Sequence, residues 1–273
     1  MHRKRKKKPV RSAPTPPAVP TAVAAPIQHV VWILMENEDY GAIIGSTSAP
    51  YINSLASTYG LATDYSAISH PSLPNYIALT SGSDQGISDD SDPSSHPLSV
   101  PSIFSELPGG ASRSLEQNMT SSCSRTNAGE YAVRHNPETY YTNLGADCST
   151  YDVPLGSVPD LSARFTFVTP NLINDMHDGT IADGDNFLAS FVPTLLATPQ
   201  YQSGSTAIFI TWDEGSGSSN QVPCIVISPY THAVKDSTPY THYALLRTTE
   251  ELLGVPLLGN AASANSMRGK FGF

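Results

Sequence analysis

The chain has 273 residues, of which only 14% are charged, and this low share excludes a coiled coil or a charge-rich disordered protein. Its apolar runs fall far short of the ~20 residues that a membrane-spanning helix needs, so a membrane-embedded protein is also excluded. Seven of the 15 basic residues lie in the first eleven positions. The remainder carries 8 basic against 24 acidic groups, a formal charge of −16 that disfavours nucleic acid as a partner.

Residues 1–26 differ in composition from the rest of the chain. A basic run, Arg3 to Lys8, precedes a stretch rich in proline and alanine, which predicts a flexible tail. A degenerate export signal is the alternative, because the charged start and the small residues before Pro26 resemble one, although prolines interrupt its apolar part. We therefore expect the folded domain to span residues 27–273.

Apolar patterns and glycine stops predict the folded elements in chain order. A buried strand at 29–35 comes first, followed by helices at 50–59 and 73–79, which end at Gly60 and Gly82. Residues 83–160 are polar and rich in proline and glycine, so we expect a loop-rich insertion with short helices. The later elements are a strand at 164–168, a helix at 185–196, strands at 207–212 and 224–227, and a closing helix at 242–253. This alternation predicts an α/β fold, with a mainly parallel central sheet and helices on both faces.

The three cysteines bear on the compartment. Cys123 and Cys148 share one polar stretch and we expect them to pair, whereas Cys224 lies in an apolar run and should be free and buried. Three unpaired thiols are the alternative. A disulfide is typical of oxidising compartments, so we expect a secreted or extracytoplasmic protein.

Carboxylate and amide groups follow two of the predicted strands, at the sheet edge where α/β proteins bind ligands. Glu36 and Asn37 follow the first strand, and Asp213 and Glu214 follow the strand at 207–212. Carboxylates that converge without a basic side chain repel one another, and a divalent cation would remove this penalty. Any one pair could be a solvated turn, but the recurrence of such clusters at several strand ends favours a metal site.

Ser72 is the candidate nucleophile. It precedes Pro74, where a helix can begin, and the free N–H groups of a helix N-terminus stabilise an anion. Asn75 adds amide donors for a phosphoryl oxygen. The alternative is that Ser72 is an ordinary N-cap residue.

Two further segments carry candidate acid–base groups. Asp175, His177 and Asp178 follow the strand at 164–168, and could bind a metal, hold a histidine as general acid or form an Asx-rich turn. His242 opens the closing helix, whose dipole favours a neutral imidazole there, although a histidine can also simply cap a helix.

Seven collinear motifs lie between residues 35 and 248, within a stretch of similarity that covers roughly residues 28–265. They are Met35-Glu-Asn37, Ser48 to Ala56, Ser69 to Gly82, Arg134-His-Asn-Pro137, Pro170 to Gly179, Thr211-Trp-Asp-Glu-Gly215 and Thr241 to Thr248. Together they resemble the phosphoesterase family of bacterial acid phosphatases and phosphatidylcholine-type phospholipases C, within the alkaline phosphatase-like superfamily. Two departures stand out: the longer phospholipases have ENRSFD where this chain has ENEDYG, and Ile173 stands where the family often has cysteine.

The resemblance implies an alkaline phosphatase-like sandwich with a divalent metal ion at the carboxyl edge of its sheet. The implied metal ligands are Glu36, Asn37, Ser72, Asp213 and Glu214. The implied substrate-binding residues are His70, Asn75, His135, Asn171 and Asp175, and the implied catalytic residues are Ser72, His177, Asp178 and His242. Such ligands suit Mg, Ca, Mn, Fe or Zn, so the metal is not identified.

The expected activity is metal-dependent hydrolysis of phosphate monoesters through a phosphoserine at Ser72, with His177 or His242 protonating the leaving alcohol. A small phosphorylated substrate is the expected partner, and the oligomeric state is not predicted. A phosphodiesterase or phospholipase C could use the same site. Two other classes stay open: an acyl hydrolase built on Ser72, His242 and Asp213, although the chain lacks a GxSxG motif, and a non-catalytic exported binding module.

Overall fold

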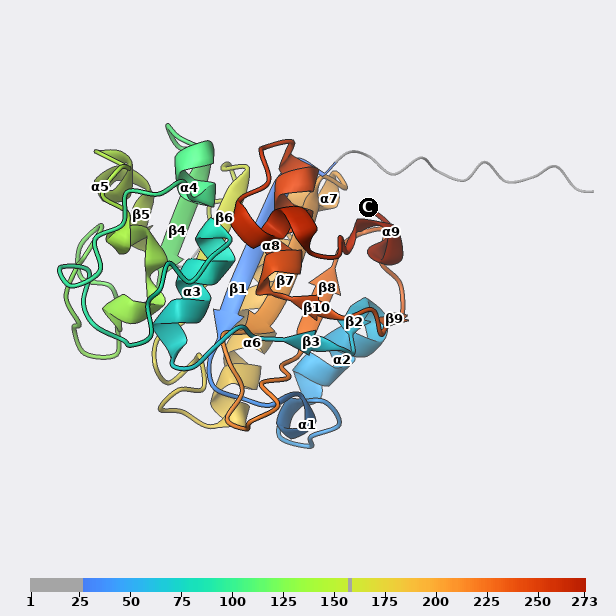
Figure 1. Ribbon diagram of the computed structural model, residues 1–273. Helices are drawn as coiled ribbons and strands as arrows, with labels where there is room; N and C mark the ends of the chain where they lie inside the picture. Colours follow the sequence, from blue (N-terminus) through green and yellow to red (C-terminus); the bar gives the residue numbers. More distant parts are fainter. Residues whose placement is uncertain (1–26, 157–158) are drawn as a thin grey trace, which may run out of the picture.

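The computed structural model describes residues 27–156 and 159–273, and its centre is an eight-stranded sheet (Figure 1). The expected tail, residues 1–26, lies outside the described residues. The strand order is β5-β4-β6-β1-β7-β8-β2-β9. The strands are β1 (His29–Met35), β2 (Gly60–Ala62), β4 (Ser112–Glu116), β5 (Asp152–Pro154), β6 (Phe165–Thr169), β7 (Thr206–Trp212), β8 (Cys224–Ile227) and β9 (Val234–Asp236).

The sheet is mainly parallel, as predicted. The five strands from β5 to β7 pair in parallel, whereas β8 is antiparallel to both β7 and β2. Strand β1 is buried from Val30 to Met35, because helices cover both faces of the sheet. A separate two-stranded sheet pairs β3 (Tyr65–Ser66) with β10 (Tyr240–Thr241).

Four longer helices cover the sheet. They are α2 (Pro50–Thr58), α3 (Ser72–Ser81), α6 (Ile181–Leu196) and α8 (His242–Leu253). Helix α3 packs against α8, and Figure 1 shows both in front of the strands, while α2 packs against α6. Trp32 of β1 donates a hydrogen bond of 2.9 Å to Thr249 of α8, which fixes that helix on the sheet.

Helix α6 begins four residues before the predicted start at 185. Thr180 and Asp183 form a capping box that satisfies the free N–H groups of the first turn. Asp185, inside α6, accepts hydrogen bonds from Tyr51 and Ile52 backbone N–H groups at 3.1 and 2.8 Å, and so binds the N-terminus of α2. The remaining short helices are α1 (Tyr40–Ile43), α4 (Ile103–Glu106), η1 (Val133–His135), η2 (Pro137–Tyr140), α5 (Asp147–Tyr151), α7 (Pro199–Gln202), η3 (Gly259–Ser263) and α9 (Arg268–Phe271).

The segment 83–160 is more ordered than the expected loops with short helices. It supplies β4 and β5, which extend the sheet beyond β6. Strand β4 was not recognised because it is polar: Ser114 is buried, and its hydroxyl donates to the Glu138 carboxylate at 2.6 Å. A disulfide joins Cys123 to Cys148, and Cys224 is free and buried, both as predicted. Across the described residues, every helix is too short or too polar to cross a membrane.

Candidate active site

The candidate site lies beyond the carboxyl ends of β1 and β7, at the end of the sheet to which the β1 arrow points (Figure 1). The pairing continues one residue past β7, because the Asp213 N–H donates to the carbonyl of Met35, the last residue of β1, at 2.9 Å. The Glu36 N–H donates to the Asp175 carbonyl at 2.8 Å, which brings the segment after β6 to the same place. Three strand ends therefore meet there, as the sequence argument requires.

Ser72 is the first residue of α3 and not its N-cap, which is Pro71. Its side chain is buried, and its Oγ lies 3.2 Å from Glu36 Oε2 and 3.4 Å from Glu214 Oε1. The hydroxyl therefore faces two carboxylates from two different strand ends. This arrangement suits a hydroxyl that loses its proton, rather than one that caps a helix.

Asn75 holds the loop before Ser72. Its Oδ1 accepts the backbone N–H groups of Ile68 and Ser69 at 2.9 and 3.0 Å, and its Nδ2 donates to the carbonyls of Ser69 and Pro71 at 2.9 and 3.1 Å. Its amide is buried and fully engaged by this loop. The structure thus gives Asn75 backbone partners where we expected phosphate contacts.

The buried carboxylates of the site have raised pKa values. Burial raises the pKa of Glu36 well above its ordinary value, and repulsion from Asp213 and Asp175 adds to this. Burial and then the neighbouring Glu214 raise the pKa of Asp213 to about 7. Burial and then Asp90 raise the pKa of Glu214 to about 7. Each of these carboxylates is costly to ionise without a nearby positive charge.

The residues around Ser72 fit a divalent cation. Asp213 Oδ1 accepts the Asn37 backbone N–H at 3.1 Å, but its Oδ2 is buried without a hydrogen-bond partner in the described part of the chain. The Asn37 side chain donates to Glu36 Oε2 at 3.3 Å. A cation would satisfy the orphaned oxygen and relieve the repulsion among the carboxylates.

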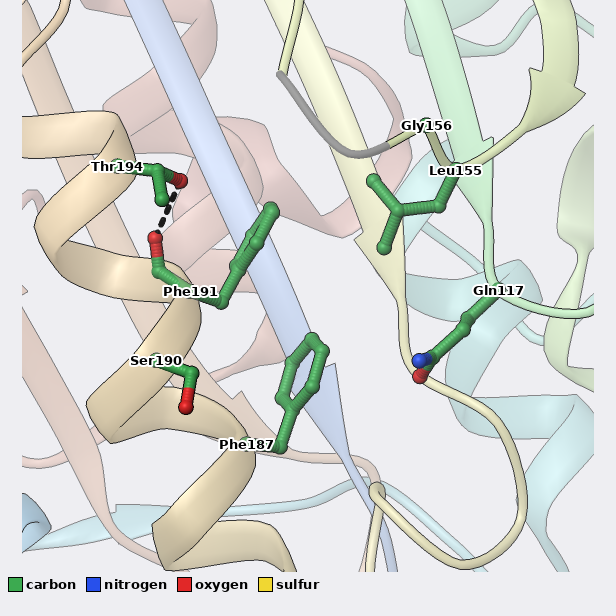
Figure 2. A pocket seen from close by; sticks show the side chains of 7 residues that line it. All are labelled: Gln117, Leu155, Gly156, Phe187, Ser190, Phe191 and Thr194. Atoms are coloured by element: carbon green, nitrogen blue, oxygen red, sulfur yellow. Dashed lines mark hydrogen bonds between the residues drawn. The ribbon is translucent and has the colours of Figure 1, made fainter.

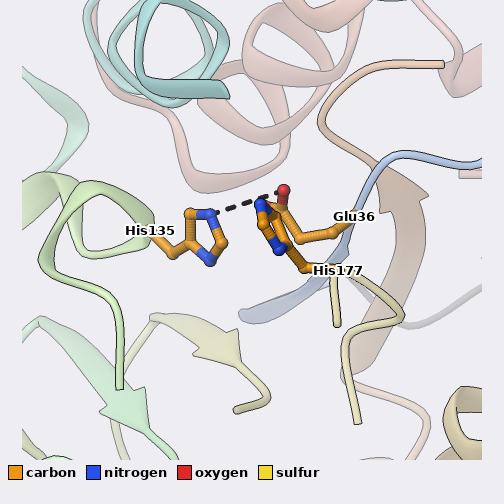
Figure 3. Close-up of side chains that lie close together, drawn as sticks. All are labelled: Glu36, His135 and His177. Atoms are coloured by element: carbon orange, nitrogen blue, oxygen red, sulfur yellow. Dashed lines mark ion pairs between the residues drawn. The ribbon is translucent and has the colours of Figure 1, made fainter. Parts of the chain in front are cut away.

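A second candidate cluster shares Glu36 and adds two imidazoles. Glu36, His135 and His177 each place a ligand atom within 4.8 Å of the others (Figure 3). His135 lies with Nε2 at 3.4 Å from Glu36 Oε2 and with Nδ1 at 3.4 Å from Asp175 Oδ2. Burial, then Arg134 and His177, hold the pKa of His135 well below its usual value, so its ring is neutral and able to bind a metal. Mixed carboxylate and imidazole ligands favour Zn, Fe or Mn over Ca.

His177 is held from both sides. Its Nδ1 lies 2.7 Å from Asp178 Oδ1, and Arg134 Nη2 donates to its Nε2 at 2.9 Å. Sequence reasoning missed Arg134, and it assumed that no lysine or arginine lies near the carboxylates. The available signal was the position of Arg134 in the motif that also contains His135.

The other predicted residues have supporting contacts. Asn171 donates to Glu130 and accepts the Asn174 N–H at 2.8 Å, which orders the segment after β6. His70 Nδ1 contacts the Glu214 carboxylate, and half of the His70 side chain is exposed.

His242 lies behind Asp213. It is fully buried, its Nε2 donates to the Asp213 carbonyl at 2.6 Å, and its Nδ1 accepts from the Tyr65 hydroxyl at 2.9 Å. Burial lowers the pKa of His242 to about 4, so the imidazole is neutral.

A cavity of about 310 Å³ lies against α6, away from these groups (Figure 2). The Phe187 and Phe191 rings stack on one wall with their centroids 5.3 Å apart. Its lining residues are Gln117, Leu155, Gly156, Phe187, Ser190, Phe191 and Thr194. Because this lining carries no ionisable side chain, the cavity offers no acid–base or metal chemistry.

The fold is similar to that of solved proteins of the alkaline phosphatase superfamily. A solved protein of that superfamily from Vibrio parahaemolyticus is similar over 91% of this chain and 72% of its own, with a TM-score of 0.61 and 12% sequence identity, a likeness that shows the fold. Residues 46–256 match the model of the phosphoesterase family, and the chain belongs to that family.

Two relatives of the chain have names that state a phosphatase activity. The chain is 34% identical over 248 residues to the phosphatidylinositol-3-phosphatase of Mycobacterium tuberculosis, covering 86% of this chain and 80% of the relative. It is 29% identical over 254 residues to a probable acid phosphatase of Kluyveromyces lactis, but covers only 58% of that protein's length. The protein is therefore a phosphoric ester hydrolase.

Proposed function

We propose that the protein is a metal-dependent hydrolase of phosphate monoesters in which Ser72 is the nucleophile and is transiently phosphorylated. The observation that carries this proposal is the buried Ser72 hydroxyl at the start of α3, within 3.2 and 3.4 Å of two carboxylates. The names of the relatives, a phosphatidylinositol-3-phosphatase and a probable acid phosphatase, favour monoesters over diesters.

The Ser72 hydroxyl gives its proton to Glu36 or Glu214, because both carboxylates lie within reach of its oxygen, at 3.2 and 3.4 Å. The Ser72 oxygen attacks phosphorus opposite the leaving alcohol, and the N-terminus of α3 stabilises the charge on the phosphoryl oxygens. Water then hydrolyses the phosphoserine. These steps need the phosphoryl group to lie between α3 and the strand ends.

Glu36, Asn37, Asp213 and Glu214 would hold the divalent cation, together with the Ser72 oxygen, and His135 and His177 are the ligands available for a second ion that shares Glu36. When bound, the cation would lower the pKa of the serine hydroxyl and neutralise charge on the phosphate.

We assign the general-acid role to His177 and a positioning role to His242. His177 is partly exposed, and Asp178 orients its ring from 2.7 Å. His177 Nε2 accepts from Arg134 in the structure, so Arg134 must release that nitrogen before it can carry a proton to the leaving alcohol. His242 is fully buried behind Asp213, so it can act on the reaction only through the Asp213 backbone.

The test is Ser72→Ala, with Ser69→Ala as the matched control in the same loop. The Ser69 hydroxyl donates only to the neighbouring His70 carbonyl at 3.1 Å. We expect Ser72→Ala to lose activity on p-nitrophenyl phosphate by about 10³-fold or more while the fold is retained. Acid quenching should trap a phosphorylated peptide that contains Ser72, and mass spectrometry would detect it. Activity near wild type in Ser72→Ala would refute the nucleophile.

Two further assays address the metal and the ester class. Chelation with EDTA should inactivate the protein, and metal analysis of the purified protein should identify the ion. Bis-p-nitrophenyl phosphate and p-nitrophenyl acetate should be poor substrates beside p-nitrophenyl phosphate. An unaffected rate after EDTA would contradict the metal, and preference for the diester would favour a phosphodiesterase.

We also propose that the protein acts outside the cytoplasm. The disulfide between Cys123 and Cys148 supports this, because such bonds persist in oxidising compartments. Cell fractionation would test it, and a fully reduced cytoplasmic protein would contradict it.

A further inference from the structure

Asp90 occupies the N-terminus of α3, the helix that begins with Ser72. Its Oδ1 accepts a hydrogen bond from the Leu73 backbone N–H at 2.9 Å, and its Oδ2 lies 3.9 Å from Arg134 Nε. The Asp90 carboxylate thus faces a backbone N–H at a helix N-terminus and a guanidinium. Proteins often use both kinds of group to bind phosphate oxygens. The Leu73 amide directly follows Ser72 in the chain, so a phosphoryl group on Ser72 would lie next to it.

The charge of Asp90 opposes the other acids of the site. It lies at the Ser72 end of α3, where Ser72 Oγ is 3.2 Å from Glu36 Oε2 and 3.4 Å from Glu214 Oε1. A carboxylate there adds to repulsion that Glu36 and Asp213 already create. Its attachment to the helix amide and to Arg134 is what offsets that repulsion.

An unpartnered buried atom beside Asp90 and Arg134 also points to a bound ligand. His135 Nε2 has no hydrogen-bond partner within residues 27–156 and 159–273, and its side chain is only 2% exposed. It lies 3.4 Å from Glu36 Oε2, on the Ser72 side of the cluster, and Arg134 precedes it in η1. The site therefore contains a buried nitrogen without a hydrogen-bond partner, next to the arginine that Asp90 contacts.

The Asp90 side chain can move away from the Leu73 N–H and Arg134 into solvent. It is an exposed residue in the irregular segment between α3 and α4, and its side chain is 35% exposed, against 20% for Arg134. A carboxylate at this position can turn into solvent without breaking a helix or strand. Arg134 is held in place by its hydrogen bond to His177 at 2.9 Å.

We propose that the Asp90 carboxylate is an internal competitor for the substrate phosphate. It binds the Leu73 N–H and faces Arg134 in the free protein, and it moves into solvent when a phosphate group takes over the same two donors. Arg134 is then a substrate-binding residue. This inference rests on the proposed function, because it takes the phosphate to bind beside Ser72.

The test is Asp90→Asn, with Asp92→Asn as the matched control. Asp92 is exposed in the same segment and undergoes the same loss of charge. KM for p-nitrophenyl phosphate and the inhibition constants of inorganic phosphate and orthovanadate would be measured at constant ionic strength. We expect Asp90→Asn to lower these constants by roughly threefold to tenfold, because a neutral amide competes less well than a carboxylate for charge-assisted contacts. Arg134→Gln should raise them by about tenfold or more.

Unchanged or higher constants in Asp90→Asn would overturn the proposal, since they would mean that Asp90 is inert or supports phosphate binding. An equal shift in Asp92→Asn would also overturn it, because the effect would then be one of general charge. Calorimetry can measure the affinity for inorganic phosphate in Ser72→Ala and in the double variant Ser72→Ala/Asp90→Asn. The difference between the two affinities reports the competition without turnover. Full activity of Ser72→Ala refutes the nucleophile instead, so the two failures can be told apart.

Discussion

His242 offers a direct test of whether a buried histidine acts by proton transfer or by position. Its Nε2 donates to the Asp213 carbonyl and its Nδ1 accepts from the Tyr65 hydroxyl, at 2.6 and 2.9 Å. The amide of glutamine can replace Nε2 and that of asparagine can replace Nδ1. His242→Gln should therefore keep the bond to Asp213, and His242→Asn should keep only the bond to Tyr65.

The size of the expected loss in activity follows from the group that loses its hydrogen bond. In His242→Asn, the Asp213 carbonyl loses a buried hydrogen bond, which costs about 1–3 kcal/mol. If Asp213 must keep its place in the transition state, kcat/KM falls by roughly 5-fold to 150-fold. His242→Gln should lose no more than about fivefold, because the bond to Asp213 survives.

The assay compares an aryl with an alkyl phosphate. The p-nitrophenolate group leaves readily without protonation, whereas an alkoxide does not, so loss of a general acid affects the alkyl ester far more. A positioning role predicts that each variant loses the same factor on both substrates. If His242→Gln proves as impaired as His242→Asn, with the larger loss on the alkyl ester, His242 is a proton donor and the positioning role is wrong.

Two other predictions concern stability and loop geometry. Burial raises the pKa of Glu250 to about 8, so between the unfolded value near 4.5 and this value the folded state binds more protons and stability falls as pH rises. Glu250→Gln should flatten that fall by roughly 1–2 kcal/mol at pH 8 in thermal unfolding, with the exposed Asp92→Asn as the control, and an unchanged pH profile would contradict it. A Cβ on Gly215 would clash with the Asp39 carboxylate, which accepts hydrogen bonds from the Ser216 hydroxyl and the Gly217 N–H at 3.1 Å. Gly215→Ala should therefore displace the loop after β7 and lower kcat/KM about tenfold or more. Adding Asp39→Ala should recover part of that loss, and no recovery would show that the clash lies elsewhere.

The central strands could be predicted because they are buried on both faces. Strands β1 and β8 are almost entirely apolar, β6 and β7 are mainly apolar with interspersed threonines, and the left-handed glycines Gly82 and Gly254 mark the ends of α3 and α8. The antiparallel direction of β8 also had a signal. Residues 213–223 carry no helical pattern, and a parallel neighbour needs a longer crossover than that.

Strand β4 could not be predicted, because hydrogen bonds rather than apolar side chains allow its burial. Ser112 donates to the Leu107 carbonyl at 2.9 Å, and Ser114 donates to Glu138 at 2.6 Å. These partners come from loops whose positions only the folded chain defines. A local pattern of serine, arginine and glutamate therefore looks like a surface segment.

Within the site, the position of a residue was easier to predict than its partners. Strand order places Glu36 and Asp213 together, since both follow neighbouring parallel strands. The Asn75 amide bonds backbone groups of the preceding loop, and the His242 ring bonds the Asp213 carbonyl and the Tyr65 hydroxyl. Sequence alone cannot show that these partners occupy both polar atoms of each side chain. Arg134 reaches the site only because the segment 83–160 folds against α3.

The charge of the chain poses a physical problem, because an acidic protein must bind an anion. The sequence argument answers it with a cation alone. The structure adds Arg134, which contacts His177 at 2.9 Å, and the N-terminus of α3. These donors and Asp90 come from α3, the segment after it and η1, whereas Glu36, Asp213 and Glu214 come from the strand ends. If the proposed function is right, the carboxylates would hold the metal and activate Ser72, while the segment around Arg134 and Asp90 would govern how tightly the phosphate binds. Changes in affinity and changes in the chemical step should then map to different parts of the chain.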